Sequence, residues 1–337
     1  MLDFRHILDQ PNANIQLFVG GKNPGAGTSS AAPYTHWETW IKPRGVRWIY
    51  MMAVGSGGAG GAGTFTIASA SPAGGGGGSG GMTTCLYPAF FVPDTLFIDV
   101  GAGGQSANTS AQTGGSGTNT DIRAEIGISG TSQAHISFCF ANGGTGGGGS
   151  TTATVGGIGG TGASTSGIGN SICMGRGIYS SYAGQTGSAG GTNGTFGVNL
   201  VYPTTGLCVT AGTGGGGGGN VGAYGGGGFI GPGANNAPDF APYGNSRYLP
   251  GAPPAPVSTP GTDGWNQLFG LFNGQGFIMN RGGAGGGGSS SLGDAAVGGT
   301  GAPGCGGGGS GGGTTNGHPT IAPSGAGGPG FAIIISF

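Results

Sequence analysis

Short apolar strips alternate along this chain with long blocks rich in glycine. A run of four to eight apolar residues bounded by glycine or proline is typical of a buried β-strand. The chain has four such strips: Val46–Val54, Thr95–Val100, His135–Phe140 and Phe331–Phe337. We expect these four strips to form one small β-sheet. Further strand candidates are Ile15–Val19, Asp121–Ile128, Val198–Tyr202 and Leu207–Thr210.

Helix is expected to be almost absent. No window of the sequence keeps a 3.6-residue apolar period without including glycine. The best helical candidates are the N-terminal segment before Pro11, where Phe4, Ile7 and Leu8 could line one face, and Trp265–Phe272.

The glycine blocks carry a second periodicity. Glycine supplies 92 of the 337 residues, and each glycine in a regular element costs roughly 0.5–1 kcal/mol relative to alanine. Within the blocks glycine often recurs at every third position, as at Gly57, Gly60 and Gly63. A period of three matches the polyproline II conformation, which rises about 3.1 Å per residue. The strict repeat of collagen is absent, so we reject a triple helix.

We therefore expect the blocks to form packed polyglycine II helices. Such helices have few side chains between them, so that their N–H and C=O groups can satisfy one another across neighbouring helices, as buried backbone groups must. The alternative is that the blocks are long turns between strands. The predicted fold is mostly β and irregular, with a small β-sheet and packed polyglycine II helices in a glycine-rich sandwich, and almost no α-helix.

Composition favours an ordered chain and excludes several functions. Only 6% of the residues are charged and 35% are hydrophobic, whereas disordered chains are usually highly charged and poor in apolar residues. The net charge of −1 leaves no basic patch for nucleic acid. No apolar run reaches the 18 or so residues that a membrane span needs, so we expect no membrane insertion. The first residues lack the apolar region of a secretory signal, so we expect folding in a cytoplasm.

No pattern of residues indicates catalysis or a cofactor. The glycines at 58–63 match a dinucleotide-binding pattern, but neither a helix nor an acidic residue follows at the required distance. The four histidines lack the spacing of a metal site. We predict a non-enzymatic protein without cofactor or metal. The five cysteines are expected to be small buried hydrophobic residues, although a disulfide could form outside a cell.

The chain divides into an N-terminal segment and a glycine-rich domain. Eight of the nineteen charged side chains lie in the first fifty residues, so residues 1–40 are predicted to be an attachment segment. The alternative is a cap over the hydrophobic end of the main domain. Residues 41–337 form the predicted glycine-rich domain, and residues 232–280 an insertion rich in proline and aromatic residues.

Several segments together resemble the glycine-rich domains of bacteriophage tail and tail-fibre proteins. The segments that carry the resemblance are Pro43–Val46, Val54–Gly61, Pro93–Gly104, Ala141–Gly149 and the terminal Gly327–Phe337. The resemblance covers roughly residues 40–149 and 325–337. It implies a virion protein, assembled in the host cytoplasm, and some members of this class are adhesins at fibre tips that contact the host cell.

The function expected on this basis is recognition of the host cell by a tail-fibre or spike adhesin. Its receptor would be a cell-surface glycan or protein. Aromatic residues are preferred in binding patches, and the candidate receptor-binding residues are Phe240, Tyr243, Tyr248, Trp265, Tyr179 and Tyr182. Packing over the glycine scaffold is the alternative role for each of them. Phe4, Ile7 and Leu8 are the candidates for attachment to other virion proteins, and the chain could also form a homo-oligomer. The alternative function is a structural virion component, such as a capsid decoration, collar or tail protein.

Overall fold

The computed structural model describes residues 13–20, 36–66, 70–125, 137–150, 155–164, 178–192, 194–201, 209–215, 217–219, 227–228, 230–231, 263, 282–283, 285–286, 296–314 and 322–337. This part of the chain is mostly β and contains two antiparallel sheets. Its one helical element is the 3-10 turn η1 (Ala89–Phe91). The predicted mostly-β fold with almost no helix is confirmed, and both predicted helices lie outside the described residues.

The first sheet has five strands, and the C-terminal strip lies directly beside the central one. Its order is β1 (Asn14–Val19), β15 (Phe331–Ser336), β3 (Trp48–Val54), β6 (Met82–Pro88) and β10 (Ile178–Tyr182). Every neighbouring pair is antiparallel. All six residues of β15 are buried, which explains why Phe331–Ile335 form a continuous apolar run instead of alternating.

The second sheet has four strands, also antiparallel. Its order is β2 (His36–Ile41), β7 (Thr95–Val100), β8 (Thr120–Arg123) and β9 (Ser137–Ala141). The prediction of one sheet from four strips is therefore wrong, because two strips form β3 and β15 of the first sheet and two form β7 and β9 of the second. The boundary expected after residue 40 falls inside β2.

The remaining strands are short pairs among the glycine-rich segments. They are β4 (Phe65–Thr66), β5 (Ala70–Ser71), β11 (Leu200–Val201), β12 (Gly218–Gly219), β13 (Ile230–Gly231) and β14 (Gly313–Thr314). Within their described parts, the candidate strand Val198–Tyr202 shrinks to β11 and the candidate Asp121–Ile128 to β8. Only Val209 and Thr210 of the candidate Leu207–Thr210 are described, and Val209 forms an isolated bridge.

Side chains from both sheets meet in one hydrophobic cluster. It includes Trp40 from β2, Met51 from β3, Ile98 from β7 and Phe138 from β9, all fully or almost fully buried. The Tyr87 hydroxyl on β6 donates to the Phe138 carbonyl oxygen at 2.8 Å, and their rings pack edge to face. A second cluster covers the other face of the first sheet, where Phe331, Ile333 and Ile335 meet residues of the glycine-rich segments.

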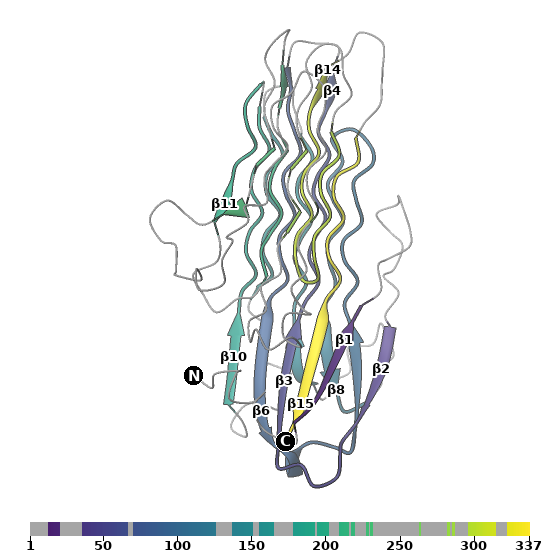
Figure 1. Cartoon of the computed structure of the whole chain (residues 1–337). Helices are drawn as coiled ribbons and strands as arrows, with labels where there is room; N and C mark the ends of the chain where they lie inside the picture. The colour runs from purple at the N-terminus through teal and green to yellow at the C-terminus, as the bar shows by residue number, and fades with distance from the viewer. Residues whose placement is uncertain are drawn as a thin grey trace.

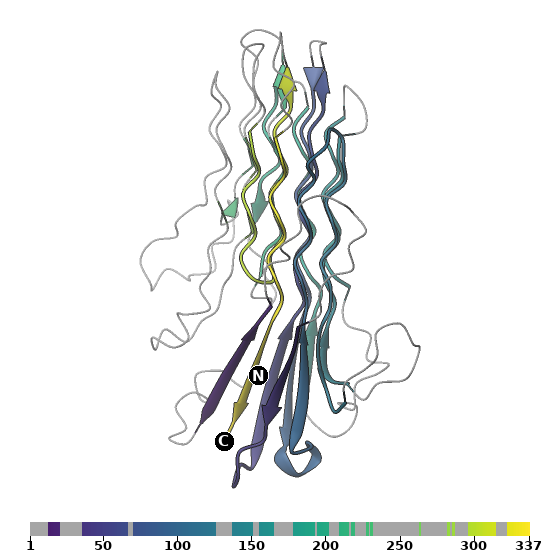
Figure 2. The same cartoon turned by 90° about the vertical axis from the view of Figure 1, so that its right-hand side faces the viewer.

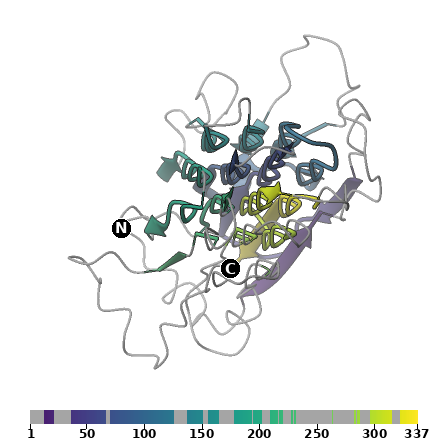
Figure 3. The same cartoon turned by 90° about the horizontal axis from the view of Figure 1, so that it is seen from above.

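The glycine-rich segments extend the strands beyond one end of the sheets (Figures 1 and 2). β3 continues into segment 55–63, and segment 74–81 returns into β6. The segments run lengthwise beside one another, and seen along their length each has a coiled trace (Figure 3). The molecule is therefore elongated, with the sheets at one end and the glycine-rich segments at the other.

Backbone hydrogen bonds join these segments in a regular register. Starting from Gly55, the first, fourth and seventh N–H groups of segment 55–62 donate to carbonyls of segment 75–81. The second, fifth and eighth donate to segment 112–118, and the third and sixth to segment 325–328. Segment 55–62 thus donates hydrogen bonds in three directions, with every third residue facing the same neighbour.

The close approach of these backbones explains the glycine at their contacts. A Cβ added at Gly57 would lie much closer than 3.0 Å to the carbonyl oxygen of Cys305, and one added at Gly75 would lie equally close to that of Ile158. Real Cβ atoms do not come so close to backbone atoms. Alanine therefore does not fit at either position unless the segments separate.

Candidate functional site

Most residues predicted to carry recognition or attachment lie outside the described part of the chain. They are Phe240, Tyr243, Tyr248 and Trp265 for recognition, and Phe4, Ile7 and Leu8 for attachment. Their roles stay predictions.

The two other predicted recognition residues lie on β10, the edge strand of the first sheet. Tyr179 and Tyr182 are paired in register with Cys85 and Met82 of β6. The Tyr182 side chain is partly buried and packs against the hydrophobic cluster on the outer face of that sheet. Packing is therefore part of the role of Tyr182, and recognition through it stays a prediction.

The most exposed aromatic group among the described residues lies at the opposite end of the sheets from the glycine-rich segments. Two connections meet there: residues 42–47 between β2 and β3, and η1 between β6 and β7 (Figure 1). The Ala89 N–H donates to the Arg47 carbonyl oxygen at 2.8 Å, so that the two connections are bonded to each other.

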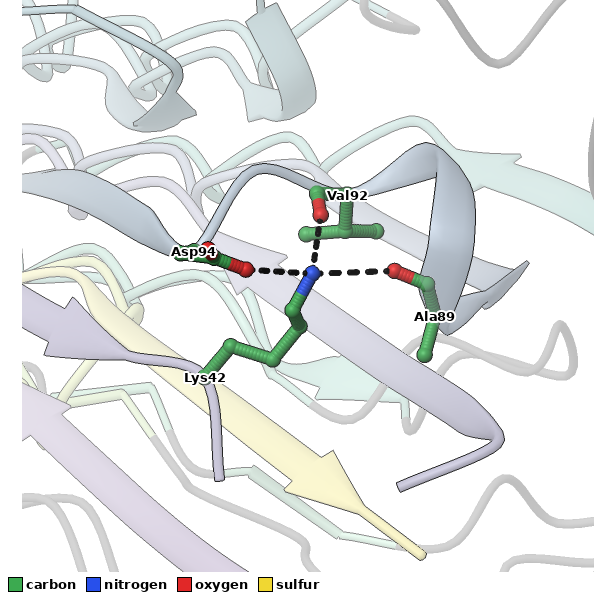
Figure 4. Close-up of polar contacts among 4 residues, drawn as sticks. All are labelled: Lys42, Ala89, Val92 and Asp94. Carbon is green, nitrogen blue, oxygen red and sulfur yellow. Dashed lines mark hydrogen bonds and ion pairs between the residues drawn. The ribbon is translucent and has the colours of Figure 1, made fainter. Parts of the chain in front are cut away.

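The Lys42 side chain lies between the two connections and binds residues at both ends of η1 (Figure 4). Its ammonium donates to the carbonyl oxygens of Val92 at 2.8 Å and Ala89 at 3.4 Å, and lies 2.8 Å from the Asp94 carboxylate. The Lys42 N–H also donates to the Asp94 carbonyl oxygen. Because Asp94 is largely exposed, the ion pair itself contributes little. The contacts to the two carbonyls hold η1 against the end of β2.

The tip surface consists of Arg44, Arg47, Trp48, Phe90 and Phe91, all exposed. The exposed fractions are 78% for Phe90, 43% for Trp48 and 37% for Phe91. The rings of Phe90 and Phe91 are in contact, with their centroids 3.9 Å apart and their planes tilted by 39°. Trp48 is paired in register with Pro88, immediately before η1, which brings the three aromatic residues to one end of the first sheet.

Local sequence explains why the arginines stand out from this end. Gly45 has φ of +82°, a region that residues with a Cβ rarely adopt, and it lies in a turn after Pro43 and Arg44. Arg47 then precedes β3, with its N–H donating to the carbonyl oxygen of Phe337. None of the sequence patterns described above predicts the tip surface. The signals that could have indicated it are the Phe90-Phe91 pair between strands and the arginines in and after the turn Pro43-Arg44-Gly45.

A cluster of polar side chains lies on the second sheet, apart from the tip surface. Asp121 accepts from Arg123 Nε at 2.6 Å and from the Ser137 hydroxyl, and the Arg123 guanidinium lies over the Trp37 ring. Asp99 is paired in register with Asp121. Burial raises the pKa of Asp99 from 3.8 to about 6, against the attraction of Arg123 and with the repulsion of Asp121.

This polar group links three strands, because Asp99, Asp121 and Ser137 come from β7, β8 and β9. Two carboxylates beside an arginine do not by themselves make an acid–base site. Among the described residues no group of three or more His, Cys, Asp or Glu could hold a metal ion. The three described cysteines, Cys85, Cys139 and Cys305, are all buried, as expected for small hydrophobic residues.

A comparison with protein-family models gives no match for the chain, and neither does a comparison with curated protein sequences. The part of the chain that the structure describes contains no helix with the length and apolar character needed to span a bilayer.

Proposed function

We propose that this protein is a non-enzymatic surface protein of a bacteriophage virion, an adhesin of a tail fibre or spike. In this proposal the glycine-rich segments are polyglycine II helices, and the two sheets pack as a sandwich at one end of them. The scaffold holds recognition residues on its loops. The observation that carries the proposal is the three-residue register of hydrogen bonds between the glycine-rich segments.

The exposure of segment 155–164 supports the polyglycine II conformation. Exposed, intermediate and buried residues follow one another with a strict period of three, beginning with exposed Val155. The buried residues Gly157, Gly160 and Ala163 all donate their N–H groups to segment 73–79. A helix with three residues per turn has three faces, so one face of this segment meets its neighbour while another meets solvent.

The environment of segment 74–81 supports dense packing of such helices. It donates hydrogen bonds to segments 142–148, 185–188 and 304–310. It accepts them from segments 55–61, 160–163 and 212–215. Six described neighbours around one extended segment is the arrangement expected of a bundle. A β-strand in a sheet would have two.

The step from scaffold to adhesin rests on two arguments. The first is the resemblance to glycine-rich domains of phage tail and tail-fibre proteins. The second is that a bundle bonded backbone to backbone has few side chains inside to perform chemistry, so function falls to the loops and ends. Aromatic residues gathered in the insertion 232–280 are suited to stacking on sugars or packing on protein.

The test is binding to the bacterium on which the parent phage grows. Fluorescently labelled protein should bind these cells and reduce infection in competition with the phage. A variant with Phe240→Ala, Tyr243→Ala, Tyr248→Ala and Trp265→Ala should bind roughly tenfold or more weakly, as expected for loss of central aromatic contacts. The matched control is Phe196→Ala, which removes an exposed aromatic ring elsewhere and should leave binding unchanged.

The structural alternative is favoured by a different observation, the exposed tip surface at the sheet end, which suits assembly into a particle. Gold-labelled antibody against the protein distinguishes the two functions on intact virions. Label at fibre tips together with cell binding supports the adhesin. Label over the capsid or tail body, with no cell binding and no competition, overturns it in favour of the assembly role.

A further inference from the structure

We infer that the tip surface is a docking site for an acidic segment of a partner protein. The inference does not depend on the chain being an adhesin, because it concerns the sheet end and not the predicted recognition loops. The proposed partner is a protein that presents carboxylates next to apolar side chains.

Charge at the tip differs in sign from charge of the whole chain. Residues 41–48 and 88–95 contain three cations, Lys42, Arg44 and Arg47, and one carboxylate, Asp94, which gives a local net charge of +2 in a chain of net charge −1. Asp94 pairs with Lys42, and no acidic side chain among the described residues pairs with Arg44 or Arg47. Arginine binds carboxylates through two parallel hydrogen bonds.

Apolar surface beside these arginines indicates a partner that also covers aromatic rings. With the exposed fractions given above, Phe90, Trp48 and Phe91 leave on the order of 300 Å² of side-chain surface in water, if each ring residue can bury about 200 Å². A patch of this size is common at functional surfaces. Trp and Arg are also the residues most enriched where interface binding energy concentrates.

The tip is held in shape before any partner arrives. Lys42 donates to the Ala89 carbonyl oxygen of η1, the Ala89 N–H donates to the Arg47 carbonyl oxygen, and Arg47 and Trp48 donate their N–H groups to the Phe337 carbonyl oxygen. Binding therefore does not have to order this part of the backbone, and a preorganised surface loses less affinity to ordering.

The number of cations favours an acidic protein over other anions. Two arginines without an acidic partner are few for nucleic acid, whose binding depends on neutralising many phosphates. An anionic bilayer also attracts clusters of basic residues, each contributing about 1 kcal/mol. Two arginines flanking aromatic rings suit a short segment with two carboxylates and one or two large apolar side chains.

A peptide selection tests the inference without knowledge of the natural partner. A random library of displayed peptides is selected on the intact protein and counter-selected on the variant Arg44→Glu, Arg47→Glu, Phe90→Ser. Selected peptides should be rich in Asp and Glu and carry a large apolar residue. No enrichment, or enrichment of neutral or basic peptides, overturns the inference.

Binding of a synthetic selected peptide is then measured by fluorescence anisotropy. Arg44→Glu with Arg47→Glu, and separately Phe90→Ser, should each weaken binding roughly tenfold or more. The control variants Ile158→Ser and Val297→Ser, which change exposed apolar residues of the glycine-rich segments, should bind as the wild type does. Unchanged unfolding temperatures show that all variants fold. Equal loss in the control variants overturns the assignment of the site.

A vesicle experiment tests whether the tip surface binds an anionic membrane instead of a protein. Phosphatidylcholine vesicles with and without phosphatidylserine are incubated with the protein and sedimented. The protein should stay in the supernatant with both. Sedimentation with the anionic vesicles that the Arg44→Glu, Arg47→Glu variant abolishes would make the tip a membrane contact and overturn the inference.

Discussion

Two adjacent glycines, Gly80 and Gly81, should respond very differently to the same substitution. Both are buried in the segment that leads into β6, and neither has positive φ. A Cβ at Gly80 would fall much closer than 3.0 Å to the carbonyl oxygen of Gly55, whereas a Cβ at Gly81 would meet the oxygen of Tyr182 at 3.2 Å. Gly80→Ala must therefore push two segments apart, and Gly81→Ala need not.

The cost of Gly80→Ala follows from the hydrogen bonds that this separation breaks. To relieve the overlap the segments must move apart by about 1 Å. That movement lengthens the bond from Gly55 N–H to the Gly81 oxygen from 3.0 Å to roughly 4 Å, beyond hydrogen-bonding range. The bond from Gly80 N–H to the Gly304 oxygen, now 2.9 Å, is strained as well. Two buried bonds lost or left unsatisfied cost about 3–5 kcal/mol.

Gly81→Ala is the matched control. Replacing glycine by alanine where the backbone allows it stabilises a protein by about 0.4–1 kcal/mol, because the unfolded chain becomes less flexible. The 3.2 Å contact offsets part of that gain, so the free energy of unfolding should change by less than about 1 kcal/mol.

Both variants are measured by denaturant unfolding followed through tryptophan fluorescence, and by calorimetry. For a chain of this length the Gly80→Ala cost corresponds to a fall of roughly 4–7 °C in unfolding temperature. If Gly80→Ala unfolds like the wild type, or like Gly81→Ala, the segments are not held at the spacing described above and the reasoning fails.

Two further predictions concern charged groups. The folded-state pKa of Asp99 is raised from 3.8 to about 6, so its contribution to stability is greatest at low pH and is lost between about pH 4 and 6, where the unfolded state ionises first. Asp99→Asn should therefore gain stability relative to the wild type across this window, by roughly 1–2 kcal/mol after solvent screening. The same difference in unfolding free energy between variant and wild type at pH 4 and at pH 7.5 would contradict this. Lys42→Met should speed amide hydrogen exchange at Val92 and lower stability by about 1–2 kcal/mol, whereas Asp94→Asn should cost less than about 1 kcal/mol because its ion pair is exposed; equal effects of the two variants would show that the carbonyl contacts of Lys42 contribute nothing.

The strongest strands were predictable from sequence because both of their faces are buried. Phe331–Phe337 and Val46–Val54 are nearly continuous apolar runs, and the structure confirms them as β15 and β3. Strand β6 was missed because MTTCLYP mixes polar and apolar residues. The same holds for β2, where HWETWI packs Trp40 inward while its neighbours face outward.

Strand pairing was harder to predict than strand position. β3 pairs with β15, nearly three hundred residues later, and no local pattern specifies such a partner. The strips divide between two sheets because β3 pairs with β15, whereas β7 and β9 are joined through the short strand β8. The tip surface was hidden for a related reason, because Phe90 and Trp48 look like core residues until the ends of their strands are known.

Hydrogen bonds that run between the glycine-rich segments, instead of along each one, determine how the molecule responds to force. The segments at the centre of the bundle, such as 55–62 and 74–81, are joined sideways to several others by successive residues, and the segments lie along the long axis of the molecule (Figure 2). A pull along that axis loads many bonds at once in shear, so that no single bond carries the tension. A pull across the axis would open them row by row. The protein should therefore resist force along its long axis more strongly than force across it.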